Sequence, residues 1–396
     1  MSLDPFSPTT TEERHETLAR MRVEAGVHKL PTGQWFAISA EAVETGLKSV
    51  EHFVGSFGDA GDLPEEKQIL AGIPEPRHGK IRKIINSVFA YHHASAVEGW
   101  ALALSERLVE GALAESGAKG SVCLMQGLAR PLPSAVIAHL LGVPSEDHAT
   151  FARWSDEVLA GAQSDMGSRP AGAELSSIHS EFGDYIREQV AVRKDDPNAP
   201  DDLTTRLLNA EVDGERLSET AVRTQLQFLI MAGNETTRNL IGNMLKHLAG
   251  LPELYRALRE DRELLVPISE EVLRVDTPVQ LLARTCTRPI VLDGVQVEAG
   301  ERVLFHVGAA NRDPARFADP TQMNPGRERV KEHLGFGAGP HICPGAFLAR
   351  METRVAFEAF LDRVQAFELA PSHRPDQNPV FWANGPQSLR VVLERA

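Results

Sequence analysis

Apolar residues recur every three or four positions over long parts of the chain, which is the spacing of an amphipathic helix. The spacing holds across 94–141, 147–193 and 218–250, and it returns across 348–364 after a run of glycines and prolines. Ser218 is a suitable N-cap for the third of these helices. The pattern predicts a mainly helical protein.

Shorter segments rich in β-branched and aromatic residues predict strands. A hairpin is expected where 28–30 and 35–38 flank a Pro-Thr-Gly turn. Further strands are expected at 290–292, 295–297 and 303–306, and near Phe367 and Val391. These elements predict a mainly α fold with small β-sheets (α+β), and because no linker is visible, a single domain over residues 1–396.

Glycines and prolines are dense between Val54 and Pro76, so we expect a long loop there. Long loops in compact proteins are often functional lids.

Composition excludes several classes of partner. The formal charge is −14, and hydrophobic and charged residues make up 42% and 24% of the chain. An acidic protein of this kind lacks the basic face that nucleic acids and anionic membranes require. The polar N-terminus resembles no signal peptide, and the longest apolar stretches, such as 135–143, fall short of the roughly 20 residues that span a bilayer. We expect a cytoplasmic protein without nucleic-acid or membrane partners.

The three cysteines have no paired spacing, which argues against disulfides and a zinc site. Cys123 and Cys286 lie in apolar or strand-like surroundings and look structural. Cys343 differs, because it sits among glycines and prolines just before a predicted helix. A helix N-terminus favours a thiolate, so Cys343 is a candidate ligand. A small buried hydrophobic residue is the open alternative.

The long helix contains a polar interruption, Ala232-Gly233-Asn234-Glu235-Thr236-Thr237. A glycine in a helix costs about 1 kcal/mol relative to alanine, and a threonine hydroxyl can bend a helix by bonding back to a carbonyl. One interpretation is a kink at a close helix crossing. The other is an opened turn that admits a small ligand, with Glu235 and Thr236 relaying protons.

Two charged pairs are also candidates. His78 and Arg82 are four residues apart and share one helix face, although a solvated pair explains that spacing equally well. Glu271 and Arg274 lie in a short helix that begins at Pro267, where an exposed ion pair is the simple explanation.

The string Phe336, Gly337, Gly339, His341, Cys343 and Gly345 resembles the haem-binding loop of the cytochrome P450 superfamily. The resemblance covers about 78–350 and implies the cytochrome P450 fold, with haem b between the long helix and the helix after the cysteine loop. It implies that Cys343 ligates the iron. The cofactor-binding positions that it implies are His78, Arg82, Ala232, Arg284, Phe336, Gly337, His341, Cys343 and Gly345.

Within the same resemblance, Glu235 and Thr236 match an oxygen-activation motif, with glutamate where aspartate is an alternative. Glu271 and Arg274 match a structural Glu-x-x-Arg pair. The substrate pocket is implied along the 54–76 loop, the 160s to 180s and Ala232, and at Leu229, Val279, Leu281, Leu282, Phe381 and Trp382. These residues are mostly apolar, which favours a lipophilic substrate.

The resemblance therefore implies a monomeric monooxygenase that uses O2 to hydroxylate a lipophilic small molecule. The chain lacks glycine-rich nucleotide motifs, so electrons are expected from a ferredoxin and an NAD(P)H-dependent ferredoxin reductase. A basic patch for that partner is expected at Arg77, Lys80, Lys83, Arg350 and Arg354. A peroxide-using peroxygenase or lyase, and a haem-based ligand sensor without turnover, remain as alternatives.

Overall fold

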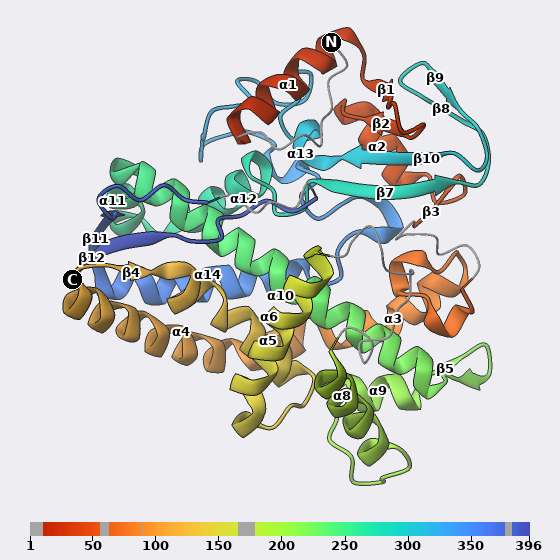
Figure 1. Ribbon diagram of the computed structural model, residues 1–396, viewed down its shortest axis with the longest axis horizontal. Coiled ribbons are helices and arrows are strands. Elements are labelled where there is room, and N and C mark those ends of the chain that lie inside the picture. The colour runs from red at the N-terminus through yellow and green to blue at the C-terminus, as the bar shows by residue number, and fades with distance from the viewer. Residues whose placement is uncertain (1–10, 56–62, 90, 165–178, 377–381) are drawn as a thin grey trace.

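The computed structural model describes residues 11–55, 63–89, 91–164, 179–376 and 382–396. Helices fill most of the molecule, and a sheet lies at one end beside α1 and α2 (Figure 1). The predicted class, mainly helical with small sheets, is confirmed. The helices are α1 (Thr11–Glu24), α2 (Ala40–Lys48), α3 (Arg77–Phe89), α4 (Tyr91–Lys119), α5 (Pro131–Leu140), α6 (His148–Ser164), α8 (Ser180–Arg193), α9 (Leu203–Asn209), α10 (Glu219–Gly250), α11 (Pro252–Glu260), α12 (Leu265–Val275), α13 (Val307–Ala310) and α14 (Ala346–Arg363).

The strands pair across long stretches of sequence. They are β1 (Val27–Lys29), β2 (Trp35–Ala37), β3 (Phe53–Gly55), β4 (Val122–Cys123), β5 (Glu211–Val212), β6 (Glu215–Arg216), β7 (Leu281–Cys286), β8 (Ile290–Leu292), β9 (Val295–Val297), β10 (Arg302–His306), β11 (Val364–Leu369) and β12 (Arg390–Arg395). The largest sheet has the order β1-β2-β10-β7-β3, in which β2 and β10 are parallel and the other neighbours antiparallel. A second sheet has the order β11-β12-β4, and β5–β6 and β8–β9 form hairpins.

Helix α10 runs through the middle of the molecule (Figure 1). The Ser218 hydroxyl accepts a hydrogen bond from the Ala221 N–H, so the predicted N-cap is confirmed. Leu226, Ile230 and Leu240 are at most 1% exposed, because α10 packs against α5, α6, α12 and α14. This burial holds the polar interruption of the helix inside the protein.

Helix α14 follows the cysteine loop and is anchored in the main apolar core. It packs along α4 and also contacts α10 and α12. Val355, Phe357 and Phe360 are fully buried on it. The N-terminus of α14, and therefore the loop before it, has a fixed position relative to α10.

The sequence predictions fail mainly at very short strands. The region 94–141 is helical except for β4 and a π-helical turn at Met125–Ala129. β4 forms because it pairs with β12, which lies far away in the sequence, and no local pattern signals that partner. In the predicted 54–76 loop the structure shows the end of β3 and 3₁₀ turns at Glu65–Lys67 and Leu70–Gly72. Residues 56–62 of that loop lie outside the described ranges.

Among the helices that the structure describes, none combines the length and the apolar character needed to cross a bilayer.

Candidate functional site

The loop that carries Cys343 is closed by its own backbone and needs glycine at two positions. Gly337 and Gly339 have φ values of +77° and +68°, which other residues rarely adopt. A Cβ atom on Gly339 would lie 2.9 Å from the Cα of Lys48, so glycine also lets the loop lie against α2. The Cys343 N–H donates to the Phe336 carbonyl at 2.8 Å. The thiol is thus presented from a defined turn just before α14.

The surroundings of Cys343 act on its thiol in opposing ways. The Cys343 side chain is exposed. The protein around the sulfur still excludes much of the water that would solvate a thiolate, and this desolvation raises the pKa of the thiol. The Gly345 N–H and the guanidinium groups of Arg82 and Arg350 oppose this increase without reversing it. That the helix terminus favours the thiolate stays a prediction. A bound metal ion would favour it, since metals bind the deprotonated sulfur.

His78, Arg82 and His341 gather beside this loop. The His78 and His341 rings lie 4.0 Å apart between centroids, and His78 is only 1% exposed. Arg82 donates from Nη2 to the Ile342 carbonyl, so α3 lies against the cysteine loop. Burial, followed by the positive potential of His78, lowers the pKa of His341 to about 3. The alternative of a solvated His78–Arg82 pair is therefore wrong.

Arg284 on β7 is a buried cation without a carboxylate. It is 6% exposed, and among the described residues its side chain donates to the Ala283 carbonyl and pairs with no acid. Burial lowers its pKa to about 10, because an uncompensated charge is costly away from water. Its positive charge also lowers the pKa of His341. An anionic group beside Arg284 would remove this cost, and the carboxylates of a haem fit that requirement.

The middle turn of α10 is unusually open. Ala232 is exposed and Thr236 is half-buried, whereas Asn234 and Glu235 between them are buried. The Thr236 hydroxyl donates to the Ala232 carbonyl at 2.8 Å, as expected for a threonine that bonds back one turn. One side of this turn therefore faces space that the described residues do not fill.

Glu235 points into the protein and is paired. Its Oε1 accepts from Arg238 Nη2 at 3.0 Å, and Arg238 also lies 3.8 Å from Asp156. Burial lowers the pKa of Arg238, and Glu235 opposes that decrease. The sequence did not reveal this pairing, although the i,i+3 spacing of Glu235 and Arg238 is a signal that could have been used.

Glu271 and Arg274 form a fully buried core pair on α12. Arg274 Nη2 and Nε donate to the two oxygens of Glu271 at 2.7 and 2.8 Å, and neither side chain is exposed. Arg327, which lies in the segment before the cysteine loop, also donates to Glu271 at 3.0 Å. The simple explanation of an exposed ion pair is wrong, because the network ties α12 to the segment before the cysteine loop.

Some of the predicted pocket walls meet, and others do not. A bridge between Val279 and Ala383 brings the residue beside Trp382 next to the start of β7. Leu281 and Leu282, which were both predicted to line the pocket, project to opposite faces of β7, and they pack in different apolar clusters. At most one of them shares the face of Arg284, and by alternation it is Leu282.

For the remaining residues predicted to line the substrate pocket, the structure gives little evidence. Leu229 on α10 is only 5% exposed, and its place at the pocket stays a prediction. Phe381 and residues 165–178 lie outside the described ranges.

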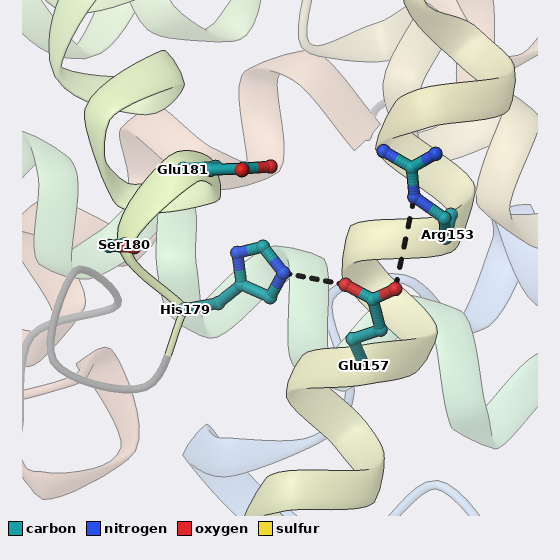
Figure 2. Close-up of a pocket in the computed structure, with 5 residues that line it drawn as sticks. All are labelled: Arg153, Glu157, His179, Ser180 and Glu181. Atoms are coloured by element: carbon teal, nitrogen blue, oxygen red, sulfur yellow. Dashed lines mark hydrogen bonds and ion pairs between the residues drawn. The ribbon is translucent and has the colours of Figure 1, made fainter.

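A polar pocket does lie between α6 and α8, lined by Arg153, Glu157, His179, Ser180 and Glu181 (Figure 2). His179 Nε2 lies 2.6 Å from Glu157, and its Nδ1 accepts from the Phe182 N–H as the cap of α8. Because Nδ1 accepts, the neutral ring donates from Nε2. These contacts join the two helices.

The predicted basic patch is largely neutralised. Arg77 and Lys80 both pair with Asp213. The other arginines of the patch also have acidic partners, with Arg350 bound to Glu270 and Arg354 bound to Glu98 and Glu358. Lys83 is exposed, and no ion pair to it occurs among the described residues. Of the five residues of the predicted patch, Lys83 is therefore the one without an acidic partner among the described residues.

Glu75 was missed by the sequence analysis. Its Oε1 lies 2.8 Å from His78 Nδ1, and its Oε2 accepts from the Gly79 N–H. Burial opposes ionisation of Glu75, but these hydrogen bonds lower its pKa overall. The Glu-x-x-His spacing at the head of α3 was the available signal.

Comparison with known proteins is consistent with this geometry. Residues 35–389 match the family model described as cytochrome P450. The chain is 31% identical over 385 residues to cyclomarin C epoxidase CymV of Salinispora arenicola, covering 96% of this chain and 95% of that protein. It is 35% identical over 333 residues to a methyl-branched lipid omega-hydroxylase of Mycobacterium tuberculosis, covering 84% and 76%. The structure of CYP109Q5 from Chondromyces apiculatus matches with a TM-score of 0.85 and 30% identity, covering 100% of this chain and 98% of that one.

A buried acid on α14 leads to a prediction about pH. Glu352 is 2% exposed, and its Oε2 has no hydrogen-bond partner among the described residues. Burial raises the pKa of this carboxyl from 4.5 to about 8. The folded state therefore keeps a proton that the unfolded chain loses above about pH 4.5, so stability falls as pH rises from there to about 8.

We expect Glu352→Gln to stabilise the protein at pH 7 by roughly 3 kcal/mol, because the amide removes the cost of keeping the acid protonated. Urea unfolding of the holoprotein between pH 5 and pH 8 measures this, and the variant should show a flatter profile. Asp362→Asn, on the exposed end of the same helix, should leave the profile unchanged. An equal pH dependence in Glu352→Gln and the parent would contradict the assignment.

Proposed function

The chain belongs to the cytochrome P450 family, and from this premise we propose that Cys343 is the iron ligand of a haem b and that a ferredoxin supplies the electrons. The protein is a haem-thiolate monooxygenase that inserts one oxygen atom of O2 into a lipophilic small molecule. The observation that supports the assignment of the site is the buried Arg284, which pairs with no acid among the described residues and acts on His341 of the loop that presents the exposed Cys343 thiol.

The residues around Cys343 have distinct tasks in binding the cofactor. Arg284, Arg82 and the His78–His341 pair offer donors to the haem carboxylates. Cys343 would bind the iron through its sulfur, and the closed turn, in which the Cys343 N–H donates to the Phe336 carbonyl, fixes the position of the Cys343 backbone. When bound, the haem supplies the oxygen activation, which no side chain can perform.

Thr236 and Glu235 handle protons on the α10 side. The Thr236 hydroxyl already donates to the Ala232 carbonyl, which leaves its oxygen lone pairs available to accept a hydrogen bond. Glu235 is held by Arg238, so it delivers protons only when its carboxylate leaves that partner. The half-buried Thr236 is the group that faces the open space, and Glu235 stands behind it.

The substrate is lipophilic, and hydroxylation is the reaction that the site supports. Val279, Leu282 and Trp382 are half-buried apolar residues, and they are the described side chains that we propose to line the substrate pocket. One relative is named for action on methyl-branched lipids. Binding of candidate lipids, steroids and terpenoids displaces water from the iron and shifts the haem spectrum, so a panel of such compounds tests the substrate class.

The first prediction concerns the ligand. Cys343→Ala should abolish the absorption band of the thiolate-ligated, carbon monoxide-bound reduced haem, because the replaced side chain cannot bind iron. Carbon monoxide difference spectra measure this. Cys123→Ala and Cys286→Ala, which remove thiols of the apolar interior, should keep the band. A band that persists in Cys343→Ala would remove the proposed site.

The second prediction separates O2 turnover from use of peroxide. Thr236→Ala should lower the product formed per NAD(P)H by about tenfold and raise hydrogen peroxide release, because proton delivery is impaired. Product, NADH consumption and peroxide are measured in a reconstituted system. Thr224→Ala is the matched control, since Thr224 makes the same back-bond to Thr220 at 2.9 Å in the same helix. Unchanged coupling in Thr236→Ala would favour the peroxygenase alternative.

The third prediction concerns the redox partner. Lys83→Gln should slow reduction by a ferredoxin by about tenfold at low salt, because charge steers association. Arg354→Gln should have a smaller effect, since Glu98 and Glu358 already neutralise Arg354. Stopped-flow reduction at several salt concentrations compares the two variants. Equal rates for Lys83→Gln and the parent protein at every salt concentration would contradict docking at Lys83.

A further inference from the structure

A buried carboxylate holds both ends of the cysteine loop. Glu270 on α12 is 2% exposed and accepts two hydrogen bonds from Arg350, Nε to Oε1 at 2.6 Å and Nη2 to Oε2 at 2.9 Å. His333 Nε2 lies 3.1 Å from the same Oε2. His333 stands before the loop and Arg350 in the first turns of α14 after it. One acid therefore fixes two segments that flank Cys343.

Arg350 also reaches the residue that supports the thiol. Its guanidinium carbon lies 4.5 Å from the centroid of the Phe336 ring. The Phe336 carbonyl accepts the Cys343 N–H at 2.8 Å. A short series of contacts thus runs from Glu270 through Arg350 and Phe336 to the backbone of Cys343.

The series contains one negative and one positive side chain close to the loop. Burial alone would raise the pKa of Glu270, but Arg350 and His333 lower it to about 2, so this acid is ionised at neutral pH. Glu270 therefore offsets the positive charge of Arg350, which lies against Phe336 of the loop. If Glu270 loses its negative charge, the positive charge of Arg350 is no longer neutralised. If Arg350 is replaced, the negative charge of the Glu270 carboxylate is no longer neutralised by it.

We propose that the Glu270–Arg350 pair sets the reduction potential of the haem by balancing the charge beside Cys343 and by positioning Phe336 behind it. Both are positioning residues, since neither touches the iron ligand itself. The proposal rests on Cys343 being the haem ligand. Reduction adds an electron to the haem–thiolate unit, and a net positive charge nearby favours the reduced form.

The two single substitutions are expected to shift the potential in opposite directions. Glu270→Gln retains the size and a hydrogen-bond acceptor but removes the negative charge, so the potential should rise. Arg350→Gln removes the positive charge, so the potential should fall. A role limited to loop structure would move both variants the same way, since each breaks the same contact. The double variant should return towards the parent protein, because charge neutrality is restored.

A further variant separates charge from shape. Arg350→Lys keeps the cation but lacks the planar fork that binds a carboxylate through two parallel bonds. Its potential should lie nearer the parent value than that of Arg350→Gln. The exposed Arg262–Asp362 pair, at 3.1 Å, supplies the controls Arg262→Gln and Asp362→Asn. The two control substitutions remove one positive and one negative charge at a site away from the cysteine loop. They should leave the reduction potential of the haem unchanged.

Redox titration of the substrate-free holoprotein, with optical dyes as mediators, measures the potential. Carbon monoxide spectra of every variant report whether the thiolate remains bound. The proposal would be overturned if the reduction potentials of Glu270→Gln and Arg350→Gln shifted in the same direction, or did not shift, while both variants kept the carbon monoxide spectrum of the parent protein. That result would leave the assignment of Cys343 as the ligand intact. Loss of the thiolate band in the parent protein would instead remove the assignment of Cys343.

If Glu270→Gln folds poorly, the sign and size of the Arg350→Gln and Arg350→Lys shifts still decide the matter. A fall in Arg350→Gln that Arg350→Lys restores supports charge balance. No fall, or an equal fall in both, contradicts it.

Discussion

The packing of α14 into the apolar core is the constraint on which the site depends. Val355, Phe357 and Phe360 are buried between α4, α10 and α12, and they fix where the helix begins. Because the cysteine loop ends at that point, the sulfur has a defined place relative to the open turn of α10. A ligand atom held to this precision needs a rigid neighbour and not a flexible loop. The glycines of the loop supply only the bends.

Charge compensation is the second constraint, and it is arranged in two layers. Close to the loop, His78, Arg82 and Arg284 are cations or donors that exceed the acids near them. Behind them, Glu270 and Glu271 are buried carboxylates that each hold arginines from other segments. A buried charge is tolerated when it is paired, so Glu270 and Glu271 with their arginines need no ligand. The positive charges of Arg82 and Arg284 would be neutralised only when an anionic ligand binds beside them.

Local pattern was enough for the parts of this structure that depend on neighbours in sequence. The bounds of α10, its Ser218 cap and the β8–β9 hairpin follow from periodicity, capping and turn residues. The motif around Cys343 was recognisable because all its members lie within one loop. Partners from remote segments were not recognisable: Arg327 beside Glu271 and β4 beside β12 arise only through the tertiary fold. The placement of Leu281 and Leu282 at the substrate pocket stays a prediction, and alternation along β7 separates their side chains.

The isolated charge of Arg284 has a consequence for how the protein is made. Without a guest, the folded chain carries a desolvated guanidinium, whereas the unfolded chain leaves that group in water. A ligand that binds the folded form alone shifts the balance towards it by mass action. An anionic ligand that binds beside Arg284 would therefore raise the fraction of newly made chain that is folded.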